Sequence, residues 1–170
     1  SLRPQAIFDM SSNPPPGALV AKKIAQLGIT VPIVVSQNLQ TKVFANRAGD
    51  AAEQILYVGA KAAMSEVPDS DPLAANIRDF RAQFKKLAPD VELVSLSAVC
   101  ADAVLLTQVA AKSLGTKALD GNALREALET LKDVPGVQGI WNFSPTSHES
   151  VLKDGVVLLK FTKGDWHPAQ

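Results

Sequence analysis

The strongest constraint on the fold is a set of three short apolar runs separated by helix-like segments. The runs are AIFDM (6–10), IVV (33–35) and ILYVGA (55–60). Short apolar runs between turn signals are typical of buried strands, and runs without polar alternation are typical of a parallel sheet covered on both faces. Parallel neighbours need a crossover connection, which is usually a helix. These residues therefore predict a strand–helix–strand–helix–strand unit.

The connection after the first run, SSNPPPG (11–17), contains hydroxyls, an amide and three prolines. Proline is tolerated in the first turn of a helix, because its missing N–H would have no intrahelical partner there. Val20, Ile24 and Leu27 then follow at helical spacing, with Gly28 as a helix-ending residue. We expect a helix that buries this apolar stripe and that begins at a stiffened polar loop.

Helices without intervening strands are expected after the third run. A short helix within residues 41–54 precedes that run, and longer helices are expected over residues 73–88, 95–115 and 121–134, the last capped by Asp120 or Asn122. Short strands in GIWNFSP, VVLLKFT and GDWHP close the chain. The longer helices have no strands of their own to cover, which suggests a portion of a larger α/β protein.

Charge and composition exclude several partners. Seventeen basic residues balance seventeen acidic ones, so no strong field would attract nucleic acid or an anionic membrane. No apolar run approaches the roughly 20 residues of a membrane-spanning helix. The first residues, SLRPQAIF, lack a secretory signal pattern. The chain is therefore either cytoplasmic or the mature or truncated form of an exported protein.

The sequence contains no recognisable catalytic constellation. It has no G-x-S-x-G elbow, no G-x-x-x-x-G-K-[ST] loop and no G-x-G-x-x-G fingerprint. His148, His167 and Cys100 are too scattered for a metal site. We interpret His148 as stabilising the SPTSHES turn and Cys100 as an inert thiol in a helix core. We expect neither catalytic residues nor a metal or cofactor.

Five stretches of the chain carry a resemblance to a known family. In chain order they include RPQAIFDMSSNPPPGALVAKKIAQLGITVPIVVSQN, AGDAAEQILYVGA, SAVCADAVLLTQVAAKSLG, LREALETLKDVPGVQGIWNFSPTSHESV and VVLLKFTKGDW. They resemble the second lobe, the YDAV-type helix and the closing stretch of type I periplasmic solute-binding proteins, the receptors of the branched-chain amino acid type of ABC importer. The match spans nearly the whole chain.

The resemblance implies an α/β fold, with a parallel-sheet, three-layer α/β/α lobe of the periplasmic-binding-protein type plus helices of a second, incomplete lobe. Family members are substantially longer, so the chain corresponds to their C-terminal half. Residues 1–66 would form the strand–helix–strand core of lobe II, residues 67–134 the helices of lobe I, and residues 135–170 a β-rich return into lobe II. The Pro68–Pro72 linker and the GVQG stretch (136–139) are hinge candidates.

The resemblance also places a ligand cleft between the lobes. Ligands of open parallel sheets bind beyond the carboxyl ends of the strands, where the loops carrying Ser11, Ser12 and Asn13 and then Gln37 and Asn38 are expected. Backbone N–H groups at the helix start and these side chains could donate to a carboxylate. Alternatively, the serines and the asparagine cap the helix and the prolines form a rigid turn.

Asp102, which matches the DAV part of the helix motif, is a further candidate that would face the hinge. The favoured alternative is a helix residue satisfied by nearby backbone.

Departures from the family pattern bear on the ligand. Gln37 stands where amino-acid receptors often have an acid that pairs with the ligand's ammonium, and an amide cannot supply that charge. Ser11 and Ser12 replace aromatic residues, and Ala101 replaces a tyrosine. A roomier pocket follows, and an aromatic or aliphatic carboxylate becomes as credible a ligand as an amino acid.

The resemblance therefore implies an extracytoplasmic receptor of an ABC importer, which captures a small carboxylate-bearing solute by hinge closure and delivers it to a membrane permease. Its location would be periplasmic, or extracellular and membrane-anchored. A ligand-sensing regulator or receptor domain of the same fold is the alternative.

A half-length chain would expose apolar faces built for an absent sheet. These would carry Leu73, Ile77, Phe80 and Phe84 on one helix and Val104, Leu105 and Val109 on the next. A homodimer of the chain is one way to cover them.

Overall fold

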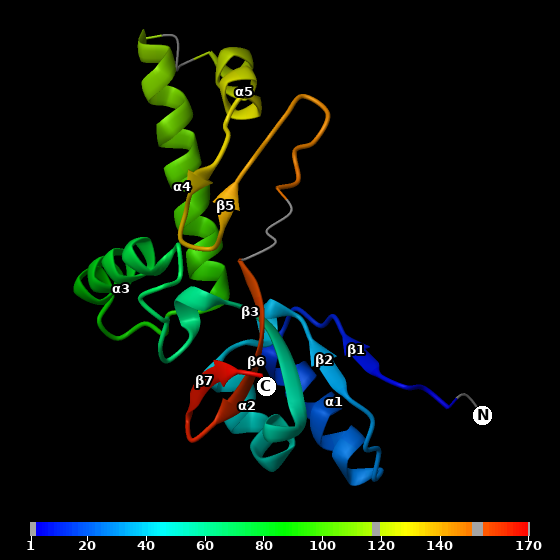
Figure 1. The fold of residues 1–170 in the computed structure, drawn as a ribbon. Helices are drawn as coiled ribbons and strands as arrows, with labels where there is room; N and C mark the ends of the chain where they lie inside the picture. The colour runs from blue at the N-terminus through cyan, green and yellow to red at the C-terminus, as the bar shows by residue number, and fades with distance from the viewer. Residues whose placement is uncertain (1–2, 117–119, 151–154, 170) are drawn as a thin grey trace.

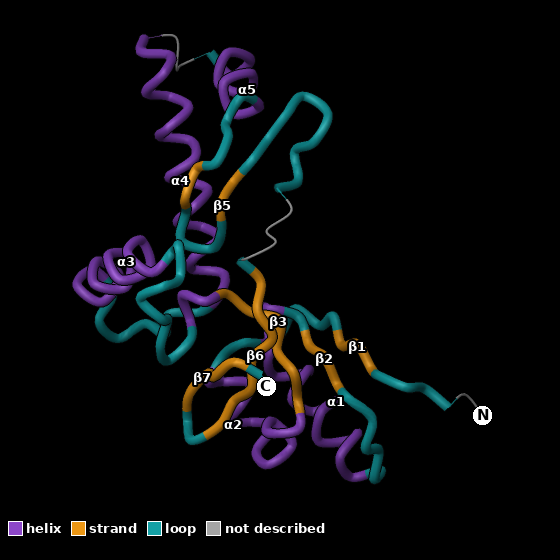
Figure 2. The backbone as a smooth tube through the Cα atoms, in the orientation of Figure 1, coloured by secondary structure: helices purple, strands orange, loops and turns teal. Residues whose placement is uncertain are grey.

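The computed structural model describes residues 3–116, 120–150 and 155–169, which form two units (Figures 1 and 2). One unit is a sheet covered by helices on one face, and the other is a group of helices with a short hairpin. One cluster of buried apolar side chains lies within the first unit, and a second cluster joins the end of β3 to the helices of the other unit.

The sheet of the first unit has the strand order β1-β2-β3-β6-β7. β1 (Ile7–Asp9), β2 (Ile33–Val35) and β3 (Ile55–Ala60) pair in parallel, as the sequence predicts. β6 (Val156–Thr162) adds to β3 in the antiparallel sense, and β7 (Asp165–Pro168) pairs antiparallel with β6. The α/β fold with a mainly parallel sheet is therefore confirmed.

Helices α1 (Pro14–Gln26) and α2 (Lys42–Ala48) pack on each other and cover one face of this sheet. Three short 3-10 helices complete the unit: η1 (Gln37–Leu39), η2 (Gly49–Gln54) and η3 (Lys61–Ala63). An aromatic series occupies the centre of the core. Phe44 and Tyr57 meet edge-on with ring centroids 5.7 Å apart, and Tyr57 and Trp166 do so at 4.7 Å.

The prediction that α1 buries an apolar stripe of Val20, Ile24 and Leu27 is wrong in part. Ile24 is buried, but Val20 is 44% exposed and Leu27 is 65% exposed. A Cβ atom on Gly17 would lie only 3.0–3.3 Å from the side chains of Leu39 and Phe44, so the helix lies too close to the core for large side chains. Its buried face consists mainly of small residues: Gly17, Ala18 and Ala21.

The opposite face of the sheet is apolar and open. Phe8, Val34 and Leu56 are in register on that face, and Phe8 is 69% exposed. Val156 and Leu158 of β6 are each 47% exposed. Of the three layers expected, the described residues provide the sheet and one layer of helices.

The second unit contains the longer helices. These are α3 (Ala74–Leu87), α4 (Ser95–Leu114) and α5 (Gly121–Glu129), with a hairpin of β4 (Val134–Pro135) and β5 (Ile140–Trp141). α5 begins at the expected cap, Asp120, whose carboxylate accepts from the N–H groups of Asn122 and Ala123. It ends earlier than expected, because the residues after Leu131 lead into the hairpin.

The expected exposure of two residues of the 73–88 segment is wrong. Leu73 and Ile77 are completely buried, in a cluster with Ala98 of α4 and Val137 of the turn between β4 and β5. Ala60 and Ala62 at the end of the first unit belong to the same cluster, and the sequence alone could not show that these segments cover the face. Phe80 and Phe84, farther along α3, are only half-buried.

The outer face of α4 remains apolar and accessible. Val104 is 59% exposed, while Leu105 and Val109 are half-buried. Cys100 is exposed, so its expected place in a helix core is wrong. By length and composition alone α4 could cross a membrane, contrary to the sequence expectation. Asp102 at its centre nevertheless binds groups of another segment, as in the core helix of a folded domain.

Polar contacts join the two units after β3. The Lys61 ammonium lies 2.6 Å from the Asp71 carboxylate, and Arg81 of α3 donates to the carbonyls of Lys61, Ala62 and Met64. Burial acts to raise the pKa of Asp71, but hydrogen bonds from Lys61 and from the Leu73 N–H, with the charge of Lys61, leave it below its ordinary value.

We predict that the 170-residue chain, produced by itself, self-associates. Burying one large apolar side chain is worth roughly 1.5–3 kcal/mol, and Phe8, Leu158 and Val104 leave most or half of theirs in water. Light scattering should give a mass above 18.0 kDa, and Phe8→Glu with Leu158→Glu should lower it. A monomer at high concentration would contradict this expectation.

We also predict an acid-sensitive contribution from Asp71. Since its pKa is lower in the folded chain than in the unfolded one (about 3.9), the carboxylate stabilises the fold above that value. The contribution is lost as the pH falls through the lower folded pKa. The difference in unfolding free energy between wild type and Asp71→Asn should therefore shrink as the pH falls from about 6 to about 3.

Urea unfolding across that pH range measures this difference. Asp69→Asn is the matched control, because Asp69 forms only an exposed pair with Arg78 and exposed pairs contribute little. A difference for Asp71→Asn that does not vary with pH would exclude the ionic origin.

Candidate ligand-binding wall

The candidate site lies at the carboxyl ends of β1 and β2. Asp9 and Val35, the last residues of these strands, are paired in the parallel register. The loops that follow therefore leave the sheet side by side from one edge (Figure 1). This edge is where open parallel sheets bind ligands. Ser11, Ser12 and Asn13 lie in the first loop, and Gln37 and Asn38 lie in η1 of the second.

Hydrogen bonds tie the two loops together. The Ser36 N–H donates to the Asp9 carbonyl at 3.1 Å, and the Ser36 hydroxyl donates to the Ser11 carbonyl at 2.9 Å. The Ser11 N–H donates to the Asp9 carboxylate at 2.9 Å, and so does the Ser11 hydroxyl. Ser12 and Asn13 are exposed. The network fixes Ser11 and leaves its two neighbours exposed at the candidate wall.

Asp9 and Ser36 are candidate site residues that sequence reasoning missed. Asp9 lies in the run AIFDM and is the last residue of β1, and Ser36 directly follows IVV. A polar residue at the end of a buried parallel strand is a signal that could have identified both. Asp9 also adds a carboxylate to a wall that the sequence suggested was built from amides and hydroxyls.

The prolines change what the first loop can donate. α1 begins at Pro14, so its first three residues are prolines without N–H groups, and the Gly17 N–H donates to the Asn13 carbonyl at 3.2 Å. The expectation that N–H groups at this helix start could hold a carboxylate is therefore wrong. The side-chain capping alternative is wrong for Asn13 as well, since it makes no cap hydrogen bond.

The second loop continues into a buried junction with α4. The Ser95 hydroxyl, at the start of α4, accepts from the Ala60 N–H at 2.8 Å and donates to the Gln40 side-chain oxygen. Gln40 is completely buried, and its amide nitrogen has no hydrogen-bond partner among the described residues. It packs directly against Gly59, where a Cβ atom would collide with the amide. Sequence reasoning did not single out Gln40 or Ser95.

Asp102 lies apart from this wall. It is completely buried and accepts from the Val137 N–H at 2.6 Å, from the Gln138 N–H at 2.8 Å and from the Trp141 indole N–H at 2.8 Å. Gly136 leaves room for the carboxylate, since a Cβ atom there would collide with it. Both carboxylate oxygens are engaged within the chain, as the structural alternative for this residue expected.

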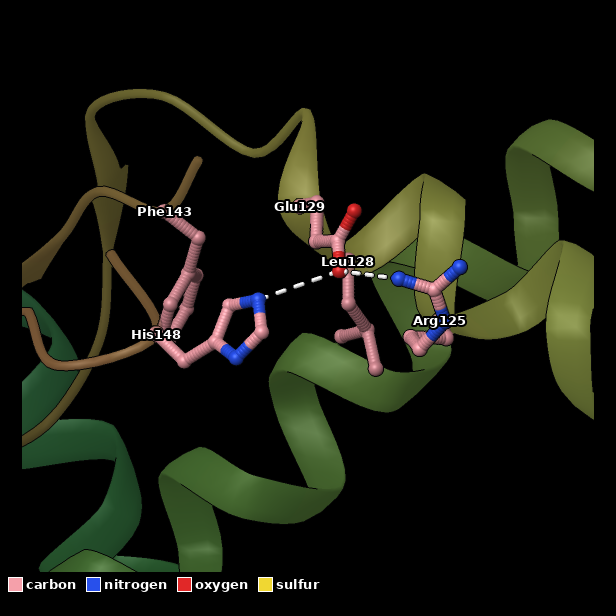
Figure 3. A pocket seen from close by; sticks show the side chains of 5 residues that line it. All are labelled: Arg125, Leu128, Glu129, Phe143 and His148. Atoms are coloured by element: carbon pink, nitrogen blue, oxygen red, sulfur yellow. Dashed lines mark hydrogen bonds and ion pairs between the residues drawn. The ribbon is translucent and has the colours of Figure 1, made fainter. Parts of the chain in front are cut away.

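A separate polar cluster joins α5 to the turn that carries His148 (Figure 3). The Glu129 carboxylate accepts from Arg125 at 2.5 Å and lies 3.0 Å from His148 Nε2. With Leu128 and Phe143 these residues line an open cavity of about 250 Å³. The cluster fixes the turn to α5, in keeping with the role expected of His148. The described residues contain no group of three or more His, Cys, Asp or Glu that could hold a metal ion.

The fold matches part of the fold of solved structures that include extracellular ligand-binding receptors and a periplasmic binding protein of type 1. One similar structure is an extracellular ligand-binding receptor from Rhodopseudomonas palustris, with a TM-score of 0.83 and 20% identity over 98% of this chain. Another is a leucine-binding protein from Thermotoga maritima, with a TM-score of 0.75, 23% identity and the same coverage. A possible leucine/isoleucine/valine-binding protein from Rhodopirellula baltica gives a TM-score of 0.77 and 15% identity.

The chain spans about half the length of these proteins: 48% of the first, 44% of the second and 43% of the third. No protein-family model matches the sequence, and no curated protein matches it. The likeness shows the shared fold.

We predict that Asp102 acts through folding. Asp102→Ala leaves three donors without their acceptor, two of them in buried residues, and the loss should cost roughly 3 kcal/mol or more of unfolding free energy. Asp79→Ala, on the exposed face of α3, is the control and should change stability by less than about 0.5 kcal/mol. Urea unfolding measures both. A stable Asp102→Ala protein that fails only in ligand binding would contradict this assignment.

Proposed function

We propose that the chain is part of an extracytoplasmic solute-binding receptor of an ABC importer. The single observation that carries the proposal is the pair of polar loops at the carboxyl ends of β1 and β2, tied by Ser36, in a fold shared with ligand-binding receptors. The names of the similar structures, which include a putative branched-chain amino acid ABC transporter, support a permease partner and a periplasmic or extracellular location. They also support a binding protein rather than an enzyme.

The proposed mechanism is hinge closure around the solute. Ligand contacts made from both units would favour the closed state, because a ligand shifts an equilibrium only through its different affinity for the two states. Lys61–Asp71 and Gln40–Ser95 bridge the two units near the wall. The segments containing Pro68–Pro72 and Gly136–Gly139 remain the proposed hinges, and the lobe boundaries near residues 66 and 134 remain proposals.

The proposed ligand is a small carboxylate-bearing solute, either an amino acid or an aromatic or aliphatic acid. Ser12, Asn13, Gln37 and Asn38 would contact it, with Ser11 positioned by Asp9. Since α1 offers no N–H groups in its first three residues, side-chain amides and hydroxyls of this wall would donate to the ligand. Gln37 supplies no charge for an ammonium group.

Differential scanning fluorimetry of the natural full-length protein tests the function. Amino acids and aromatic or aliphatic acids are added singly, and a ligand bound only by the native state raises the melting temperature. We expect carboxylates without an α-amino group to stabilise at least as well as leucine or valine. Stabilisation by no solute would contradict the receptor role.

Gln37→Glu tests the ligand preference separately. A new carboxylate should weaken binding of simple acids and strengthen binding of α-amino acids, with each tenfold change corresponding to about 1.4 kcal/mol. Gln54→Glu, on an exposed residue of η2, is the matched control. Calorimetry that finds tight binding only of free α-amino acids to the unmodified protein would contradict the proposed preference.

A further inference from the structure

A groove on the outer surface of the first unit lies next to the candidate wall. It runs between the start of α1 and the end of α2 and has a volume of about 360 Å³. The lining includes Pro15, Pro16, Leu19, Lys22, Asn46 and Arg47. This volume is at the lower end of the range of ligand pockets, about 300–1,000 Å³.

Part of the groove is apolar. Leu19 is 69% exposed, although it lies on a helix whose opposite face is packed closely against the core. Pro15 and Pro16 add rigid apolar surface at the start of the same helix. The groove therefore offers an apolar contact that needs little ordering on binding.

Basic residues predominate in the segment that forms the groove, which lies between Asp9 and Asp50 in the sequence. Residues 11–48 contain Lys22, Lys23, Lys42 and Arg47 but no Asp or Glu, although the whole chain is electrically balanced. Lys22 and Arg47 line the groove and are exposed. Within the described residues, neither forms an ion pair. Asp50 shares with Lys22 the hollow beside the groove and does not line the groove itself.

We propose that this groove docks an extracytoplasmic segment of the membrane permease that carries carboxylates beside an apolar side chain. The apolar side chain would contact Leu19 and Pro16, and the carboxylates would pair with Lys22 and Arg47. The inference rests on the proposed function, which supplies the permease.

The position of the groove gives this docking a link to ligand binding. Pro15 and Pro16 lie only two and three residues after Asn13, so a partner in the groove contacts the helix that begins at the candidate wall. The affinity of the partner could thereby differ between the open and closed positions of the wall. A concave groove between two helices favours an inserted side chain over the flat surface of a membrane.

A short peptide tests the docking. The probe is Glu-Leu-Glu-Glu-Leu-Glu, blocked at both ends, added to the ¹⁵N-labelled natural full-length protein. We expect amide shifts confined to Leu19, Lys22, Arg47 and their neighbours, and binding that weakens with added salt. Lys22→Glu with Arg47→Glu should reduce the affinity at least about tenfold, equivalent to 1.4 kcal/mol.

Two controls make the result specific. Lys85→Glu with Lys86→Glu reverses two exposed charges on α3, away from the groove, and should leave the affinity unchanged. The peptide with glutamine in place of every glutamate should bind far more weakly. Equal binding of both peptides, or no shift at the groove, overturns the proposal.

Other occupants of the groove give distinct results. Shifts at the groove with phosphatidylglycerol vesicles but not with the peptide would assign it to a membrane. Shifts that depend only on protein concentration would assign it to a second copy. Either result overturns the proposal.

The proposed function is tested independently of the groove. Solute stabilisation of the variant with Lys22→Glu and Arg47→Glu should equal that of the wild type, because these residues lie outside the wall. A wild-type protein that no solute stabilises would count against the receptor role whatever the peptide does.

Discussion

The buried contact among Ala60, Ser95 and Gln40 is the interaction on which the arrangement of the two units depends. The Ser95 hydroxyl accepts a hydrogen bond from the N–H of Ala60, the last residue of β3, and donates one to the side-chain oxygen of Gln40 in the loop after β2. The start of α4 is thereby fixed to the carboxyl edge of the sheet, where the candidate wall lies. Its cost is a buried amide nitrogen without a described partner, and an unsatisfied buried donor typically costs about 1–3 kcal/mol.

At two places in this chain a glycine allows a buried polar side chain to lie directly against the backbone. Gly59 accommodates the Gln40 amide, and Gly136 accommodates the Asp102 carboxylate. In both cases a polar side chain of one segment is held at the backbone of another, near the junction of the two units. Gly136, the first glycine of GVQG, is therefore required by close packing as well as by the turn. A hinge movement there would have to preserve the hydrogen bonds of Asp102.

The three prolines at the start of α1 have opposite consequences for order and for chemistry. They fix the backbone next to Ser12 and Asn13, which would lower the ordering cost of the proposed binding. They also remove the N–H groups that make most helix starts suitable for anions. The wall consequently depends on side chains, and Asp9 holds Ser11 instead of leaving it available.

The sequence by itself determined the parallel order of β1, β2 and β3 and the approximate positions of the helices, because short apolar runs and helical spacing report local structure. It placed β3 to the residue, located the core of β2 at IVV and pointed to the loops of the candidate wall. Only the tertiary structure decided which side chains are covered: Leu73 and Ile77 are buried, whereas Leu27 and Cys100 are exposed. Tertiary structure also brought Asp102 of α4 against the turn between β4 and β5, and Gln40 against Ser95. Such contacts join residues 35–55 positions apart, and no local pattern encodes which distant surface a side chain will meet.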